Sequence, residues 1–112
     1  MRKTPGRRKY DQRKRRESTK KRIGARLYKR IMARDGERCV YCGGEENLQL
    51  DHLLPRSKGG NDASDNLVVA CKQCNSTRQN MNLTAWSRYL FVVRGVEFSP
   101  RKIRRRAKRN LL

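Results

Sequence analysis

The chain has little negative charge, few aromatic residues and no long apolar segment. Its 112 residues include 10 Asp and Glu against 30 Lys and Arg, which gives a formal net charge of +20, and only 6% of them are aromatic. Its longest apolar runs cover about five residues, as at 89–93, whereas a membrane-spanning helix needs about 20. We therefore expect no membrane association, and a chain this short has room for one small hydrophobic core.

A secretory signal is also missing from the sequence. Residues 1–22 are basic throughout and contain no apolar stretch of the kind that such signals require. The sequence therefore predicts a cytoplasmic protein. Disulfides are rare in that reducing compartment, so the four cysteines are better explained as metal ligands.

The positive charge lies at the two ends of the chain. Residues 1–22 carry twelve basic and two acidic side chains, and residues 101–112 carry seven basic and no acidic ones. We predict a basic flexible N-terminal arm over 1–22, a folded domain over 23–98 and a basic C-terminal helix over 99–112. Such ends suit a polyanionic partner, which they would bind with little regard to sequence.

Between the basic ends, the periodicity of apolar residues predicts a small α+β domain. Apolar spacing predicts a helix over about 19–34, which Asp35 and Gly36 would end. Two short apolar runs, from Leu48 to Leu54 and from Asn66 to Ala70, predict strands. Three further helices are expected: from Cys71 to about Asn80, over 83–94 with Thr84 and Gly95 as caps, and after Ser99-Pro100.

The cysteines form two CxxC pairs separated by 28 residues, at Cys39, Cys42, Cys71 and Cys74. Two such pairs in one intracellular chain predict a single tetrahedral Zn²⁺ site. A structural zinc ion can contribute about 10–16 kcal/mol of apparent binding free energy, so we expect folding to depend on it. Buried free thiols, or a redox pair of the thioredoxin type, fit less well because no βαβ pattern surrounds either pair.

Four polar residues between and beside the cysteine pairs are candidates for chemistry. His52 is the one histidine of the chain and follows Asp51 directly, while Asn66 and Asn75 flank the second strand and the next helix. Each also has a structural explanation. Asp51 could cap a turn, His52 could be a hydrogen-bonded filler, Asn66 could form an Asx turn, and Asn75 could cap a helix.

The segment LxxDHxxPxSxGGxDxxxNLxxxCxxCN, from Leu48 to Asn75, resembles the HNH homing-type endonuclease family. The resemblance covers about residues 30–80 and includes both CxxC pairs. It implies a ββα-metal, treble-clef-like fold in which His52, Asn66 and Asn75 stand for the three letters of the family name. The final letter is Asn here, so the chain would be an H-N-N variant.

The resemblance also implies an activity, the metal-dependent hydrolysis of DNA phosphodiester bonds, by nicking or double-strand cleavage. His52 would be the general base, because an unperturbed imidazole, with a pKa of about 6.5, is mostly neutral in the cytoplasm. Asp51 and Asn75 would offer oxygen ligands to Mg²⁺ or Mn²⁺, which prefer oxygen. Asn66 would orient the loop or the His52 backbone, and the products would carry 5′ phosphates.

Three basic residues near this segment, Arg56, Lys58 and Arg78, are expected to contact the phosphates of the nucleic acid. No helix offers a clear base-reading pattern, so low intrinsic specificity is expected. The chain is similar to compact free-standing bacteriophage enzymes, which implies a bacterial or phage-infected cytoplasm and phage packaging or recombination proteins as partners. The alternative is a non-catalytic zinc-finger module that binds DNA or RNA.

Overall fold

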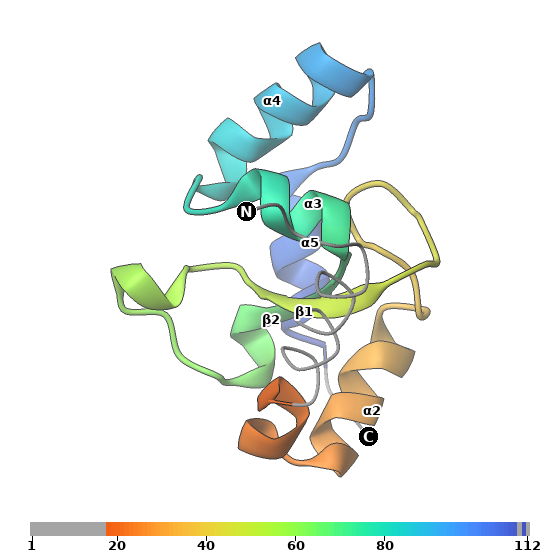
Figure 1. Ribbon diagram of the computed structural model, residues 1–112, viewed down its shortest axis with the longest axis vertical. Helices are drawn as coiled ribbons and strands as arrows, with labels where there is room; N and C mark the ends of the chain where they lie inside the picture. Colours follow the sequence, from red (N-terminus) through yellow and green to blue (C-terminus); the bar gives the residue numbers. More distant parts are fainter. Residues whose placement is uncertain (1–17, 110, 112) are drawn as a thin grey trace, which may run out of the picture.

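The computed structural model describes residues 18–109 and residue 111 (Figure 1). The expected basic arm therefore lies outside the described residues up to position 17, whereas residues 18–23 are helical. The elements that follow are α2 (Ala25–Arg34), β1 (Leu48–His52), β2 (Leu67–Cys71), α3 (Lys72–Arg78), α4 (Leu83–Arg94) and α5 (Pro100–Ala107). Among the described residues, no helix combines the length and the apolar character that crossing a bilayer requires.

The sheet of the described chain is a single antiparallel pair of strands, with His52 opposite Leu67 and Leu48 opposite Cys71. β1 ends two residues before the expected Leu54, and β2 starts one residue later than expected because Asn66 belongs to a 3₁₀ turn. Side chains alternate along a strand, so successive residues of β1 face opposite sides of the sheet. α3 follows β2 at once, which gives the expected order strand, strand, helix.

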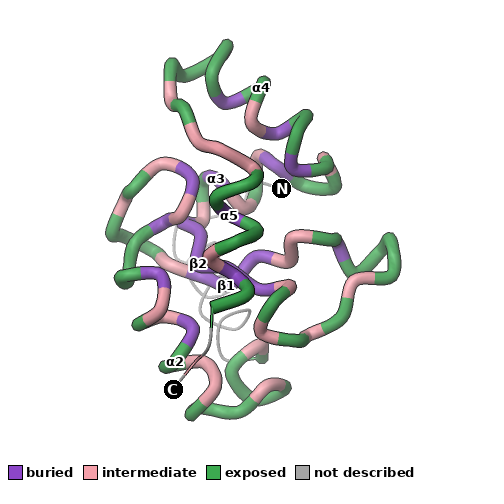
Figure 2. The backbone as a smooth tube through the Cα atoms, turned by 180° about the vertical axis from the view of Figure 1, so that it is seen from behind, coloured by how far each residue is buried: buried purple, intermediate pink, exposed green. Residues whose placement is uncertain are grey.

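Each face of the sheet is covered by its own group of helices. On one face, Ile31 of α2 packs against Leu50, Leu67 and Val69. On the other face, side chains of α3, α4 and α5 pack against Val68 and Ala70, and this larger cluster includes the fully buried Trp86. β2 is buried along its whole length, as Figure 2 shows, because it is covered on both sides.

The helix expected over 19–34 is interrupted at Gly24. This residue has a φ of 93°, which a side chain would strain, so the helical segment 18–23 and α2 are separate elements. The expected end of the helix is confirmed: Asp35 caps α2, and Gly36 adopts a left-handed φ of 74°. The apolar spacing that predicted one helix continues through Gly24, so it could not reveal the break.

The end of α2 is joined to the sheet by a buried ion pair. Arg34 Nε lies 2.9 Å from Asp35 Oδ1, and Asp35 Oδ2 accepts a hydrogen bond from the backbone N–H of Val69. The Arg34 guanidinium also donates to the carbonyl oxygens of Ser64, Leu67 and Ala107. One side chain thus connects α2, β2 and α5.

The two C-terminal helices follow the sequence closely. α4 spans the expected residues and ends at Gly95, but its N-cap is Asn82 rather than Thr84, since Asn82 Oδ1 accepts from Ala85 N at 2.8 Å. α5 begins at the expected cap, Ser99. It was expected to serve the nucleic acid more than the core, yet Ile103 and Ala107 are buried. α5 is therefore also part of the folded core.

Candidate functional site

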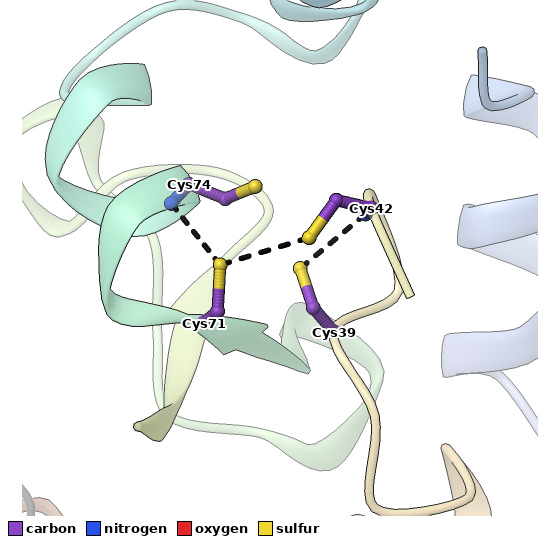
Figure 3. A group of neighbouring side chains, drawn as sticks. All are labelled: Cys39, Cys42, Cys71 and Cys74. Carbon is purple, nitrogen blue, oxygen red and sulfur yellow. Dashed lines mark hydrogen bonds between the residues drawn. The ribbon is translucent and has the colours of Figure 1, made fainter. Parts of the chain in front are cut away.

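The four cysteine sulfurs lie within 4.8 Å of one another and point toward a common centre (Figure 3). Cys39 and Cys42 come from the loop after α2, whereas Cys71 ends β2 and Cys74 lies in the first turn of α3. The Cys42 and Cys71 sulfurs are 3.8 Å apart. Four sulfurs at about 2.3 Å from a tetrahedral Zn²⁺ would be about 3.8 Å from each other, so the cluster has the dimensions of such a site.

The protein supplies donors that favour thiolates in this cluster. The backbone N–H groups of Cys42, Gly44 and Cys74 point at the sulfurs of Cys39, Cys42 and Cys71, respectively. A hydrogen bond with Cys74 lowers the pKa of Cys39 to about 5, and the same bond raises the pKa of the Cys74 thiol. Four thiols this close cannot all ionise without a cation, and Zn²⁺ binding deprotonates its ligands. These residues therefore fit a metal ion.

A second polar group lies between β1 and α3. Asn75 and Arg78, three residues apart on α3, face Gln49 and Asp51, two residues apart on β1. Asn75 Nδ2 donates to Gln49 Oε1 at 2.8 Å, and Arg78 Nη1 lies 2.6 Å from Asp51 Oδ2. The structure thus brings two of the predicted site residues, Asp51 and Asn75, to one interface. The NH₂ group of Asn75 is the part bonded to Gln49, and its amide oxygen makes no hydrogen bond to the described residues.

The carboxylate of Asp51 is almost completely buried, with 7% of the residue exposed. Besides Arg78, its Oδ2 accepts a hydrogen bond from the Tyr41 hydroxyl at 2.6 Å. Burial, and next the charge of Asp51, raise the pKa of Tyr41, so this hydroxyl keeps its proton and remains a donor. One oxygen of Asp51 is therefore held by the protein, whereas Oδ1 makes no hydrogen bond to the residues that the structure describes.

Arg78 was expected to contact phosphates at the surface, but the structure places it fully inside. Its guanidinium donates to Asp51, to the Tyr41 hydroxyl and to the carbonyl oxygens of His52, Leu53 and Met81. From the sequence alone, a basic residue at the end of the helix that contains Cys74 is expected to be exposed to solvent. Its burial depends on Asp51, a partner 27 residues away.

His52 lies at the end of β1 on the opposite face of the sheet from Asp51. Its Nε2 is 2.8 Å from Asp62 Oδ1, and 15% of the His52 side chain is exposed. Within the described chain, neither Asp51 nor Asn75 is hydrogen-bonded to the ring. The predicted general base therefore lies on one face of the sheet, and the two predicted oxygen ligands lie on the other.

Asn66 holds the loop that follows β1. Its Oδ1 accepts from Leu54 N at 2.8 Å, and its Nδ2 donates to the carbonyl oxygens of Leu54 and Asn61. Gly60 lies in the same loop, where a Cβ would be 1.7 Å from the oxygen of Leu54. The side chain of Asn66 faces the backbone of this loop and stays away from Asp51.

The other two predicted phosphate contacts, Arg56 and Lys58, are exposed in a 3₁₀ turn just beyond β1. Lys58 Nζ donates to the carbonyl oxygen of Asn80 at 2.8 Å. A cavity of about 340 Å³ is bordered by Lys58, by Leu53, by Arg104 of α5 and by Lys108, the residue that caps this helix. Basic residues at the C-terminal end of α5 therefore lie beside the loop that follows His52.

Four residues of this site were not among the predicted ones: Tyr41, Gln49, Asp62 and Arg22. Gln49 could have been found from strand alternation, since it lies two residues before Asp51. Asp62 is one of the defined letters of the motif, but the motif does not connect it with His52. Tyr41 and Arg22 gave no signal, because only the folded chain brings them near.

Residues 39–90 match the family model described as HNH endonuclease. This segment contains the four cysteines together with Asp51, His52, Asn66 and Asn75. Residues 39–90 therefore have the sequence of an HNH endonuclease domain.

Two curated relatives are both called CRISPR-associated endonuclease Cas9. The relative from Actinomyces naeslundii is 38% identical over 53 residues, which are 44% of this chain. The relative from Corynebacterium diphtheriae is 33% identical over 54 residues, which are 45% of this chain. The matched segment spans only 5% of the length of either relative.

The fold has a counterpart among solved structures, the crystal structure of the Type II-C Cas9 enzyme from Actinomyces naeslundii. The TM-score is 0.52 at 24% sequence identity, and the match covers 92% of this chain and 15% of that one. At this identity the likeness concerns the fold. It extends well beyond residues 39–90.

Proposed function

We propose that the protein is a divalent-metal-dependent endonuclease that hydrolyses DNA phosphodiester bonds. The observation that carries the proposal is the arrangement at the end of β1, within the segment that matches the HNH family. There, Asp51 and Gln49 face Arg78 and Asn75 of α3 on one side of the strand, and His52 lies on the other. A phosphodiester that runs past the end of this strand can contact both sides.

His52 would take a proton from the attacking water. General bases of this kind typically contribute about 10²- to 10⁴-fold to a rate. The ring is anchored on one nitrogen and partly exposed, so water can reach it while its direction stays fixed. Leu67, its neighbour on β2, is fully buried and gives the strand end a rigid support.

Asp51 and Asn75 would hold Mg²⁺ or Mn²⁺ through Oδ1 of the carboxylate and the amide oxygen. One carboxylate with waters and substrate phosphate is a common Mg²⁺ arrangement in proteins. When bound, such an ion supplies positive charge to the scissile phosphate and the leaving oxygen. Arg78 and Tyr41 keep the Asp51 carboxylate in one orientation, and Gln49 does the same for the Asn75 amide.

Zn²⁺ in the cysteine cluster would have a structural role. Cys71 and Cys74 join the end of β2 to the start of α3, and α3 carries Asn75. The cluster therefore fixes the helix that faces Asp51. Thiolates suit zinc and carboxylates suit magnesium, so the two sites would select different ions.

The basic surface beside the site would bind the DNA backbone. Arg56 and Lys58 lie in the loop after His52, and Arg104 and Lys108 border the same cavity as Lys58. Contacts of this kind fix position without reading sequence, so we expect low intrinsic specificity. Nicking and double-strand cleavage both fit a single site. The expected phage partners and the cytoplasmic location stay predictions.

A second candidate function, a zinc module that binds nucleic acid without cleaving it, is favoured by one observation. The Asp51 carboxylate is already neutralised by Arg78 and has little exposure. A carboxylate in that state needs a metal ion less than an unpaired one does. The basic surface and the cysteine cluster would serve such a module equally well.

Supercoiled plasmid distinguishes the two functions. The zinc-loaded protein and its His52→Ala variant would be incubated with plasmid and Mg²⁺ or Mn²⁺, with Val92→Ala on the exposed side of α4 as the control. We expect nicking by the wild type and the control, and at least a 100-fold loss in His52→Ala. Equal nicking by all three proteins, or none with any divalent ion while DNA is still bound, would favour the binding module.

A further inference from the structure

Asp62 contacts His52 through a short, direct hydrogen bond. Its Oδ1 is 2.8 Å from His52 Nε2, and the two residues are ten positions apart in sequence. The other carboxylate oxygen, Oδ2, is 2.7 Å from Arg22 Nε, on the helical segment 18–23. The imidazole, the carboxylate and the guanidinium are thus linked in series by hydrogen bonds, and they come from three different parts of the fold.

The loop that carries Asp62 is fixed on both sides of it. Asn61 Oδ1 accepts from the backbone N–H of Ala63, and the carbonyl oxygen of Asn61 accepts from Asn66 Nδ2. The absence of a side chain at Gly60 lets the loop approach Leu54. Asp62 therefore contacts the ring from a backbone that is itself held in place.

The charge of Asp62 decides which atom carries the hydrogen of this bond. Hydrogen bonds from Arg22, and then from His52, lower the pKa of Asp62 to about 2. An ionised carboxylate can only accept hydrogen bonds. The hydrogen between Asp62 and His52 must therefore belong to Nε2 of the ring.

The hydrogen on Nε2 also decides the state of the other ring nitrogen, Nδ1. In a neutral imidazole one nitrogen carries the hydrogen and the other has the free lone pair. With Nε2–H donated to Asp62, the lone pair is on Nδ1, which alone can accept a proton from water. A ring with the hydrogen on Nδ1 would present no base at that position.

We propose that Asp62, held by Arg22, is a positioning residue that keeps His52 in the Nε2–H tautomer and so leaves Nδ1 as the nitrogen that accepts the proton. This inference rests on the proposed nuclease function, because it gives His52 its active form. It adds a residue and a nitrogen assignment to that function. The ring tautomer can be measured without any cleavage.

The chain offers a sharp test because His52 is its one histidine. A ¹⁵N spectrum of the imidazole therefore shows a single ring, and the shifts of the two nitrogens identify the tautomer once they no longer change with rising pH. The key variant is Asp62→Asn. Arg22 requires an acceptor, so the new amide would turn its oxygen to Arg22 and its NH₂ group to Nε2.

The matched control is Asp65→Asn, which removes the same charge from the same loop without a contact to His52. We expect the Nε2–H tautomer in the zinc-loaded wild type and the control. In Asp62→Asn we expect the Nδ1–H tautomer, with kcat for plasmid nicking reduced about 10- to 100-fold and KM unchanged. The double variant Arg22→Ala with Asp62→Asn frees the amide to turn back, and should restore Nε2–H.

Three outcomes would overturn the proposal: an Nδ1–H tautomer in the wild type, an Asp62→Asn ring identical to that of Asp65→Asn, or an unchanged kcat in an active Asp62→Asn enzyme. Failure of the nuclease function would differ from all three, since the wild type would then not cleave at all. The tautomer measurements would remain valid in that case. They report on the Asp62 contact alone.

Discussion

Asp51 and Arg78 form an ion pair in the interior of the domain, with 2.6 Å between Oδ2 and Nη1 and no exposed surface on the arginine. Two charges without water are stabilised only if their remaining hydrogen bonds are made. Here the Tyr41 hydroxyl donates a second hydrogen bond to the same carboxylate oxygen, and the guanidinium donates to three backbone carbonyl oxygens. The pair joins α3 to β1 and orients a predicted metal ligand.

Replacing Arg78 should therefore be costly. Arg78→Met leaves the Asp51 carboxylate buried without its partner, and breaking such a pair typically costs about 3–5 kcal/mol. Urea unfolding of the zinc-loaded protein would measure the loss of unfolding free energy. Arg88→Met, on the exposed side of α4, is the control and should change stability by less than about 0.5 kcal/mol. Equal stability of the two variants would contradict the structural role of the pair.

Removing the metal from the cysteine cluster should unfold the domain. Cys74→Ser should have the same effect, because this fully buried sulfur would be replaced by an oxygen ligand in a site built for thiolates. Far-UV circular dichroism would follow the loss of helix after addition of a chelator. Ser76→Ala on the exposed face of α3 is the control. A spectrum unchanged by chelator would show that the fold does not need the ion.

Asn75→Ala should weaken binding of the proposed catalytic ion without disturbing the cysteine cluster. The amide oxygen is one of the two ligands that we propose, so the Mg²⁺ concentration for half-maximal nicking should rise about tenfold or more. Paramagnetic broadening by Mn²⁺ would check the same affinity without turnover. In the wild type, Mn²⁺ should broaden signals of residues near Asp51. The same broadening at the same Mn²⁺ concentration in Asn75→Ala would remove Asn75 from the ligand set.

Gly60→Ala should be more harmful than Gly59→Ala, although the two glycines are adjacent. At Gly59 the cost is a left-handed φ of 93° with open space around the Cβ, about 1 kcal/mol. At Gly60 the new Cβ would collide with the carbonyl of Leu54, which Asn66 holds, and we expect about 3 kcal/mol. Urea unfolding of both variants gives the comparison. The reverse ranking would mean that the loop is not fixed as described.

Substitutions on α5 should change the salt dependence of DNA binding. Arg101 and Arg105 are exposed, and each phosphate contact contributes about −0.9 to the log–log slope on duplex DNA. Replacing both with Gln should reduce the magnitude of the slope by up to about 2, measured by fluorescence anisotropy between low and moderate salt. Arg88→Gln on α4 should leave the slope unchanged. An unchanged slope in the double variant would exclude these residues from the interface.

Much of the fold could be predicted because its signals are local. The span of α4, the cap at Ser99 and the end of α2 each depend on a few neighbouring residues, and all three are confirmed. The clustering of the four cysteines could also be predicted, since two CxxC pairs supply the four ligands of one metal ion. The break at Gly24 was missed because apolar spacing continues through it, and the buried side of α5 was missed because its charge dominates its composition.

The amino-acid sequence by itself determined the cysteine frame, the resemblance to HNH endonucleases and the residue types available for chemistry. Tertiary structure alone decided which polar side chains meet: Asp51 with Arg78, Asn75 with Gln49, and His52 with Asp62. These pairs join residues 10 to 27 positions apart on different elements. Charge and hydrogen-bonding capacity are properties of single residues, but a partner is chosen by the path of the backbone between them.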